Sequence, residues 1–145
     1  LQSCSQFADG QYYASGSIQK DTSDTYNGGA WSLKMMIAGS SVNNGVQVYV
    51  ISYPVASGAS GTITYYLKKN ASFTGSLTPT LWLANGIVKS GTAIAAADMS
   101  SSAYTQFTIT FAAGDIPQDG LLTFGFIHTG SVHAINIDTL SGGIS

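Results

Sequence analysis

The sequence has 145 residues, 44% of them hydrophobic, which is enough for one domain with a full core and too short to suggest two. Its charged residues are five lysines and seven aspartates. The sequence has no cluster of lysines and no arginine, the residue that most often binds phosphate in a bidentate way. We therefore expect no nucleic-acid partner. No apolar run approaches the ~20 residues of a membrane-spanning helix, so we also expect no membrane insertion.

Residues 1–10 form a short polar N-terminal segment that we expect to be only loosely held by the domain. Residues 20–29 are predicted to be a loop, because they are rich in small polar residues and glycine. Elsewhere, stretches that alternate apolar and polar residues are separated by turns containing Gly, Pro, Asn or Asp, which is typical of β-strands. In chain order the predicted strands are residues 11–18, 30–37, 46–53, 61–69, 80–84, 87–89, 104–111, 121–128 and 133–140.

Two early strands carry patterns that predict which of their faces are buried. Trp31 shares one face of its strand with Leu33 and Met35, so we expect it in the core. The strand at residues 46–53 is apolar on both faces and is predicted to lie centrally, with Pro54 ending it.

The stretch 61–69 has the most regular alternation and is predicted to be a strand in the middle of a sheet. Its apolar face should belong to the core and its other face to an open surface. The core face carries Ile63, Tyr65 and Leu67, and the open face carries Thr62, Thr64, Tyr66 and Lys68.

The second half of the chain carries a hairpin signal, a helical signal and a histidine pair. Asn85-Gly86 predicts a type I′ hairpin turn, and the alanine-rich residues 92–99 are the one place where a helical turn is expected. His128 and His133 flank a predicted turn. Because no Cys or Glu supports a metal site there, we expect a surface pair at a loop tip.

About eight short strands with almost no helix predict an all-β fold, an antiparallel β-sandwich or a barrel. The sequence contains no internal repeat, low-complexity linker or charge run. We therefore expect residues 1–145 to form a single domain.

Four segments, in chain order, resemble the jelly-roll carbohydrate-binding modules and galactose-binding-like domains. Residues 27–35 (NGGAWSLKM) resemble a strand entry of these domains, and residues 61–69 resemble their central strand. Residues 104–111 (YTQFTITF) are similar to their penultimate region, and residues 134–140 (AINIDTL) to their closing strand. The resemblance implies a jelly-roll β-sandwich acting as a non-catalytic module, as found in secreted glycosidases, bacterial surface proteins and bacteriophage structural proteins.

The same resemblance implies a structural calcium ion held by Asp138 and by backbone carbonyls of the loop before Trp31. Calcium takes about six to eight oxygen ligands, and Asp9, Asp21 or Asp24 are candidates for the rest. The alternative is an aspartate at a strand end that is hydrogen-bonded to a turn. Thr139 stands where the family often has a second acidic residue.

Sugars stack on aromatic rings while amide, amine and hydroxyl groups bond their hydroxyls. Trp82 points away from its leucine neighbours, so it is expected on an open sheet face beside the open face of residues 61–69. The alternative is that these rings are packing residues. The predicted ligand-binding residues are Trp82, Tyr66, Lys68, Tyr104 and Gln106.

Catalytic signals are missing from the sequence. It has no glutamate, no apparent pair of acid and base carboxylates, and no Gly-x-Ser-x-Gly elbow. We therefore expect no enzyme but a carbohydrate-binding module within a larger extracellular, cell-surface or virion protein. The alternative is a structural or assembly domain whose open face contacts neighbouring protein subunits instead of a glycan.

Overall fold

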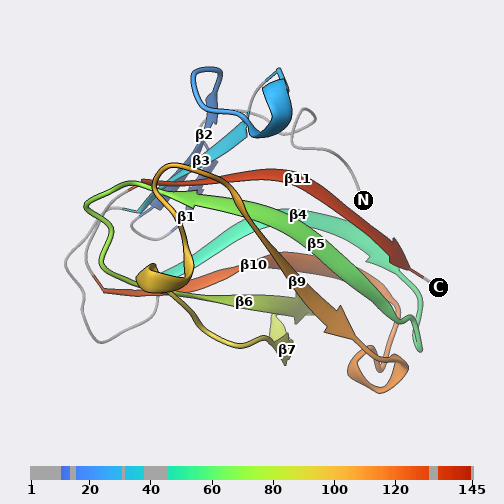
Figure 1. Ribbon diagram of the computed structural model, residues 1–145. Helices are drawn as coiled ribbons and strands as arrows, with labels where there is room; N and C mark the ends of the chain where they lie inside the picture. Colours follow the sequence, from blue (N-terminus) through green and yellow to red (C-terminus); the bar gives the residue numbers. More distant parts are fainter. Residues whose placement is uncertain (1–10, 14–15, 31, 38–45, 131–133, 145) are drawn as a thin grey trace.

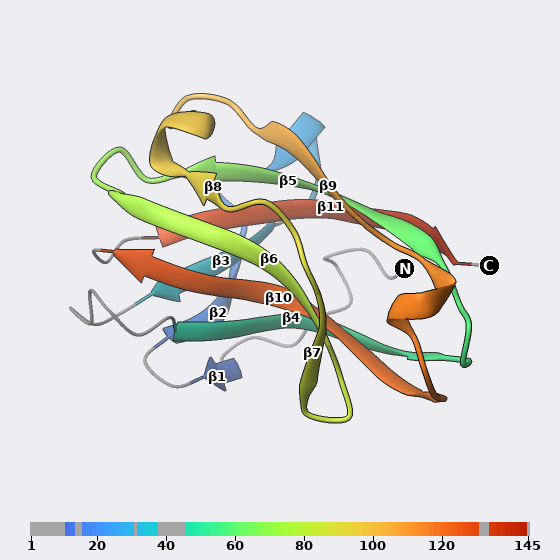
Figure 2. The same ribbon diagram turned by 90° about the horizontal axis from the view of Figure 1, so that it is seen from below.

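The computed structural model describes residues 11–13, 16–30, 32–37, 46–130 and 134–144 (Figure 1). Its strands pair antiparallel throughout and form two sheets that face each other as layers (Figures 1 and 2). The predicted antiparallel β-sandwich is thereby confirmed. The described helices are short 3₁₀ turns, and none of them has the length or the apolar character needed to cross a membrane.

The first sheet has six strands in the order β1-β2-β3-β11-β5-β9. Its strands are β1 (Gln11–Tyr13), β2 (Gly16–Asp21), β3 (Ser32–Ile37), β11 (Ala134–Ile144), β5 (Gly61–Lys69) and β9 (Thr105–Phe111). The 3₁₀ turn η2 (Tyr26–Gly28) lies in the loop between β2 and β3. The strand predicted at residues 61–69 is β5, and it pairs with β11 on one side and β9 on the other.

The second sheet has five strands, in the order β4-β10-β6-β7 with the short β8 also paired to β6. Figure 2 looks onto this sheet from below. Its strands are β4 (Val46–Val55), β10 (Gly120–Gly130), β6 (Gly75–Leu83), β7 (Gly86–Ser90) and β8 (Ile94–Ala95). Two further 3₁₀ turns, η3 (Ala96–Asp98) and η4 (Ala113–Asp115), lie on either side of β9 in the sequence.

One continuous hydrophobic core fills the space between the sheets. Ile63, Tyr65 and Leu67 have no exposed surface, so the core face predicted for β5 is confirmed. Leu33 and Met35 are also fully buried, whereas Trp31 lies outside the described residues. From the second sheet, the core side of β10 contributes Leu122, Phe124 and Phe126.

Two predictions of position were wrong. β4 is an edge strand of its sheet and not a central one, and Pro54 lies within it. An edge strand tolerates proline because one side of its backbone has no strand partner. The β6–β7 turn consists of Ala84 and Asn85, both with positive φ, and not of Asn85 and Gly86. Asparagine accepts positive φ well, so the turn forms one residue earlier and Gly86 begins β7.

The alanine-rich residues 92–99 form β8 followed directly by η3. The helical turn expected there is therefore present as a single 3₁₀ turn. The carboxylate of Asp98 accepts a hydrogen bond from the backbone N–H of Ala95 at 2.8 Å, which caps the start of this turn.

Candidate functional site

A pocket opens on the outer face of the five-stranded sheet, away from the core. Its volume is about 430 Å³, and its walls come from β4, β6, β10 and the β6–β7 turn. The lining residues are Tyr49, Ser52, Trp82, Ala84, Asn85, Gly120, Leu121 and Thr123. None of these side chains carries a charge, so this Trp82 pocket offers aromatic rings, hydroxyls, one amide and apolar surface.

The strand register places three lining residues in one row. Thr123 of β10 lies between Ser52 of β4 and Trp82 of β6. The leucines on either side of Trp82 belong to the core, so alternation turns the Trp82 side chain outward. The hydroxyls of Ser52 and Thr123 are hydrogen-bonded at 2.6 Å. Backbone pairing therefore fixes the floor of the pocket.

Trp82 is nevertheless only 5% exposed, and Tyr49 is one of the residues that cover it. The two ring centroids lie 4.9 Å apart with planes at 84°, an edge-to-face arrangement. The Tyr49 hydroxyl donates a hydrogen bond to Oε1 of Gln47 at 2.6 Å. Tyr49 is half-buried, so the aromatic surface that the pocket presents to a ligand belongs mainly to Tyr49, with Trp82 supporting it.

Sequence reasoning missed Tyr49 because it took residues 46–53 as a central strand that is apolar on both faces, and so predicted no open face there. Val50 and Ile51 are consecutive, yet both are buried in the core, at 2% and 5% exposure. A bulge at this point lets two successive residues face inward. It also leaves Tyr49 and Ser52 together on the outer face, where both line the Trp82 pocket.

The bulge depends on a glycine in the neighbouring strand. The register between β10 and β4 shifts between Phe124 and Gly125. A Cβ atom on Gly125 would overlap the carbonyl oxygen of Val48, so only glycine allows the two backbones to come this close. A glycine inside a strand often marks a bulge, and it is the one signal in the sequence that could have predicted this arrangement.

Apolar side chains border the Trp82 pocket. Leu121, which lines it, is 60% exposed, and Ile87, which pairs with Trp82 in the β6–β7 register, is 52% exposed. Among the described residues these are the large hydrophobic side chains that are clearly exposed. The pocket thus combines apolar surface with neutral hydrogen-bonding groups, as the ring face and hydroxyl edge of a sugar require.

Four of the five predicted ligand residues lie on the other sheet. Tyr66 and Lys68 come from β5, Gln106 from β9, and Tyr104 from the residue before β9. Trp82 belongs to β6 of the opposite sheet, so the expectation that it lies beside the open face of β5 was wrong. Alternation indicates which side chains point outward from a strand, but it does not indicate to which sheet the strand belongs.

Tyr26 of η2 covers this second face. Its ring stacks on Tyr66, with centroids 4.1 Å apart and planes at 20°. It also meets Tyr104 edge to face, with centroids 5.8 Å apart. The Tyr66 hydroxyl donates to Oε1 of Gln106 at 3.2 Å. Tyr26, Tyr66 and Tyr104 therefore form a tyrosine cluster in which the ring of Tyr26 contacts the other two rings.

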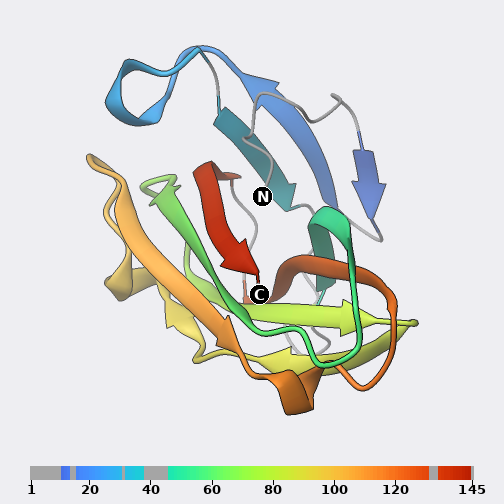
Figure 3. The same cartoon turned by 90° about the vertical axis from the view of Figure 1, so that its right-hand side faces the viewer.

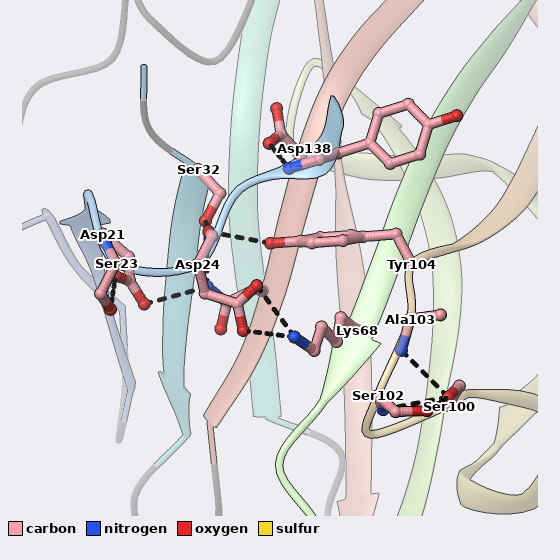
Figure 4. Close-up of polar contacts among 12 residues, drawn as sticks. Asp21, Ser23, Asp24, Ser32, Lys68, Ser100, Ser102, Ala103, Tyr104 and Asp138 are labelled. Carbon is pink, nitrogen blue, oxygen red and sulfur yellow. Dashed lines mark hydrogen bonds and ion pairs between the residues drawn. The ribbon is translucent and has the colours of Figure 1, made fainter. Parts of the chain in front are cut away.

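Lys68 and Tyr104 hold the β2–β3 loop against the sheet (Figure 4). Nζ of Lys68 lies 2.8 Å from Oδ2 of Asp24. The backbone carbonyl of Asp24 accepts hydrogen bonds from the Tyr104 hydroxyl at 3.0 Å and from Ser32 Oγ at 2.7 Å. Burial raises the pKa of Tyr104 to about 12, so its hydroxyl keeps its proton and acts as a donor. Whether these residues also contact a ligand stays a prediction.

Asp138, the predicted calcium ligand, is 6% exposed and is used inside the protein. Its Oδ2 accepts a hydrogen bond from the backbone N–H of Tyr26 at 2.8 Å (Figure 4). The carboxylate of Asp24 is occupied by Lys68. Across the described residues, no group of three or more His, Cys, Asp or Glu side chains lies close enough to hold a metal ion.

Asp21, another candidate calcium ligand, is also engaged by donors. Burial opposes its ionisation, but hydrogen bonds from Ser23 and Asn136, together with nearby Lys34, lower its pKa to about 2. Its Oδ1 accepts hydrogen bonds from the backbone N–H of Ser23 at 2.8 Å and from Oγ of Ser23 at 2.6 Å. Its Oδ2 accepts a hydrogen bond from Nδ2 of Asn136 at 3.0 Å. Because donors hold the carboxylates of Asp21, Asp24 and Asp138, these three side chains do not fit a calcium ion as they are arranged here, and Asp9 lies outside the described residues.

The histidine prediction was wrong for His128, while His133 lies outside the described residues. His128 is 1% exposed, and its ring lies 5.8 Å from the ring of Phe73. β10 extends to Gly130, beyond the predicted end of the strand, and His128 falls on the same face as Phe124 and Phe126. The strand period therefore places it in the interior.

No protein-family model and no curated protein matches the sequence. Solved structures do match the fold. The CBM22-1 xylan-binding domain of Paenibacillus barcinonensis Xyn10C gives a TM-score of 0.66 over 99% of this chain and 92% of that chain, at 13% identity. The CBM27-1 module of Caldicellulosiruptor saccharolyticus, in complex with mannohexaose, gives 0.57 over 85% of this chain and 80% of that chain, at 14% identity.

The same fold is also present in an enzyme. The cyclase Fisc from Fischerella sp. TAU gives a TM-score of 0.60 over 90% of this chain and 74% of that chain, at 12% identity. The chain therefore has the jelly-roll β-sandwich of carbohydrate-binding modules, as the sequence resemblance implied. Because a fold does not determine a function, the function has to be argued from the site.

Proposed function

We propose that the protein is a non-catalytic carbohydrate-binding module that binds an uncharged glycan in the Trp82 pocket. The observation that carries this proposal is an open pocket of about 430 Å³ with an aromatic wall, neutral hydroxyl and amide groups and no charged side chain. A sugar ring packs its apolar face on an aromatic side chain and directs its hydroxyls to such groups. The fold shared with a xylan-binding domain supports the proposal.

The Trp82 pocket suits this function better than the tyrosine cluster does. Tyr26 already stacks on Tyr66, and Lys68 is paired with Asp24. A ligand on that face would compete with contacts inside the protein. In the Trp82 pocket, Tyr49 and the exposed Leu121 leave surface for a ligand.

The chemistry of the Trp82 pocket favours binding over catalysis. Glycoside hydrolysis commonly requires two carboxylates that flank the scissile bond. None of the lining residues is an aspartate, a glutamate or a histidine. An acid–base mechanism therefore has no proton donor or acceptor of the usual kind in this pocket. A module with this function would act outside the cell or at its surface, where polysaccharides are accessible.

Titration calorimetry against a panel of soluble neutral polysaccharides, with xylan and mannan among them, tests the proposal. We expect at least one of them to bind, and Tyr49→Ala to weaken that binding by at least about tenfold, equivalent to about 1.4 kcal/mol. The matched control is Tyr66→Ala, which removes the same side chain from the opposite sheet and should leave the affinity unchanged. Circular dichroism verifies that both variants are folded.

Two results would contradict the proposal. One is the absence of binding to every polysaccharide in the panel, which would favour the alternative of an assembly domain that contacts protein. The other is an equal loss of affinity in Tyr49→Ala and Tyr66→Ala, because the ligand would then not be specific to the Trp82 pocket. Release of reducing sugar from any bound polysaccharide would overturn the non-catalytic assignment.

A further inference from the structure

β9 is the outer strand of the six-stranded sheet, and one side of its backbone has no strand partner among the described residues. On its inner side it pairs with β5 along all seven residues. Figure 3 shows β9 at the margin of its layer, next to β5. In the described part of the chain, every strand-pairing contact of β9 is to β5, and no hydrogen bond from another segment caps its outer edge.

Proteins normally protect such an edge with a charge, a proline, a bulge or a very short strand. The other sheet edges show these devices: β1 has three residues, β4 contains Pro54 and a bulge, and β7 contains Lys89. The sequence of β9 is TQFTITF, which has no charge and no proline, and its pairing with β5 has no register shift. Of these edges, β9 is the one that lacks protection.

A hollow beside β9 leaves apolar surface uncovered at the same edge. Its volume is about 230 Å³, and it is lined by Phe107 and Thr108 of β9 together with Tyr65, Pro79, residues 92–94 and Asp98. Phe107 packs against the core but is only half-buried, whereas Ile109 and Phe111 further along the same face are buried. A strand added to the β9 edge would cover the exposed part of Phe107.

We propose that β9 is a self-association edge, at which two copies of the chain pair antiparallel across a two-fold axis and join their six-stranded sheets. A two-fold axis at Thr108 uses all seven residues of the strand. It places Phe107 opposite Ile109 of the second copy, Thr105 opposite Phe111 and Gln106 opposite Thr110. Apolar residues then meet mainly apolar ones on the core side, and polar residues meet polar ones on the outer side.

A second copy is the occupant that the chemistry of the strand favours. An uncharged strand suffers no electrostatic repulsion when it pairs with itself, whereas nothing in β9 selects a charged partner. This inference is independent of glycan binding, because the Trp82 pocket lies on the opposite sheet.

Sedimentation velocity over a wide range of protein concentrations tests the proposal. We expect a reversible dimer, and we expect Thr108→Lys to shift the dissociation constant at least tenfold, because the two lysines would face each other at the two-fold axis. The matched control is Thr64→Lys. Thr64 pairs with Thr108 on the same outer face but lies in β5, away from the edge, and this variant should dimerise as the parent does.

Cross-linking provides a second measurement that does not depend on the stability of the lysine variants. In a Cys4→Ser background, Thr108→Cys should form a disulfide-linked dimer on mild oxidation, and Thr64→Cys should not. A monomer at every concentration, a dimer that Thr108→Lys leaves intact, or equal cross-linking at both positions would overturn the proposal.

Discussion

The outer faces of the two sheets carry similar side chains but are organised in opposite ways. The six-stranded sheet bears Tyr66 and Tyr104, yet the β2–β3 loop lies over them and binds them through Tyr26 and Asp24. The five-stranded sheet bears Tyr49 and Trp82 and leaves an open pocket above them. One face is closed by contacts within the chain, whereas the other has groups that remain accessible to a ligand.

The difference shows that exposure of an aromatic residue depends on the loops as much as on its strand. Both faces have rings, hydroxyls and amides at outward positions. What distinguishes the closed face is a polar loop whose backbone groups are held by Asp138, Tyr104 and Ser32. Substitutions that disturb one face and spare the other can therefore test this comparison.

The largest effect is expected for Gly125→Ala, which disturbs the bulge below the Trp82 pocket. The added methyl group would overlap the carbonyl oxygen of Val48, so β4 must move or change its register. We expect a loss of about 3 kcal/mol in the free energy of unfolding, measured by urea denaturation. Glycan affinity should fall as well, because Tyr49 is positioned by this bulge.

Gly114→Ala is the matched control for this substitution. A Cβ atom at Gly114 meets no atom within 4 Å, so the unfolding free energy should change by less than about 1 kcal/mol. Equal stability of the two variants would show that the close approach of β10 and β4 is not needed for the fold.

The sequence predicted the layers of the fold better than its surface. Alternation along β5 correctly predicted the core residues Ile63, Tyr65 and Leu67, because burial on one face of a regular strand imposes a period of two. In β4, which was predicted to be apolar on both faces, the bulge that buries both Val50 and Ile51 was not foreseen. A bulge depends on the neighbouring strand, so the alternation of β4 alone does not reveal it.

The sequence did not predict the functional site well, because the site depends on contacts between residues that are far apart in the chain. Trp82 was predicted to face outward and does so, but its sheet and its cover by Tyr49 follow from strand order. The partners of Lys68 and Asp138 are Asp24 and the backbone of Tyr26, which lie 44 and 112 residues away along the chain. The sequence contains the residues of both faces, but not the loop position that closes one of them.

A smaller effect is expected for Asp138→Ala on the closed face. The substitution removes the acceptor for the part-buried N–H of Tyr26 and should cost about 2 kcal/mol in the free energy of unfolding, the range for a hydrogen bond to a charged group. Glycan affinity at the Trp82 pocket should be unchanged. Because donors already hold the carboxylates of Asp21, Asp24 and Asp138, we expect that neither added calcium nor a chelator alters the melting temperature of the parent protein.

Asp98→Ala is the matched control for Asp138→Ala. Asp98 also accepts a backbone N–H, from Ala95, but it is exposed, so its loss should cost only about 1 kcal/mol. If Asp138→Ala were no more destabilising than Asp98→Ala, the β2–β3 loop would not depend on its buried anchor.

The smallest effect is expected from a change in pH. It should alter the stability of the protein through Asp21 and leave glycan binding in the Trp82 pocket unaffected. Hydrogen bonds and Lys34 lower the pKa of Asp21 to about 2 in the folded protein, against 3.8 for the free side chain. The ionised form is therefore favoured in the folded state. Its contribution to stability is present above about pH 3.8 and is lost as the pH falls towards 2.

Melting temperatures between about pH 5 and pH 2 measure this contribution, and Asp21→Asn should flatten the curve. The flattening will be partial, because a hydrogen bond from the backbone N–H of Ala112, aided by Lys89, also lowers the pKa of Asp115. Over the part of this range in which the protein is folded, glycan affinity should stay constant, because no carboxylate or histidine lines the Trp82 pocket. A glycan affinity that falls with the titration of Asp21 would mean that the closed face and the open pocket are coupled across the core.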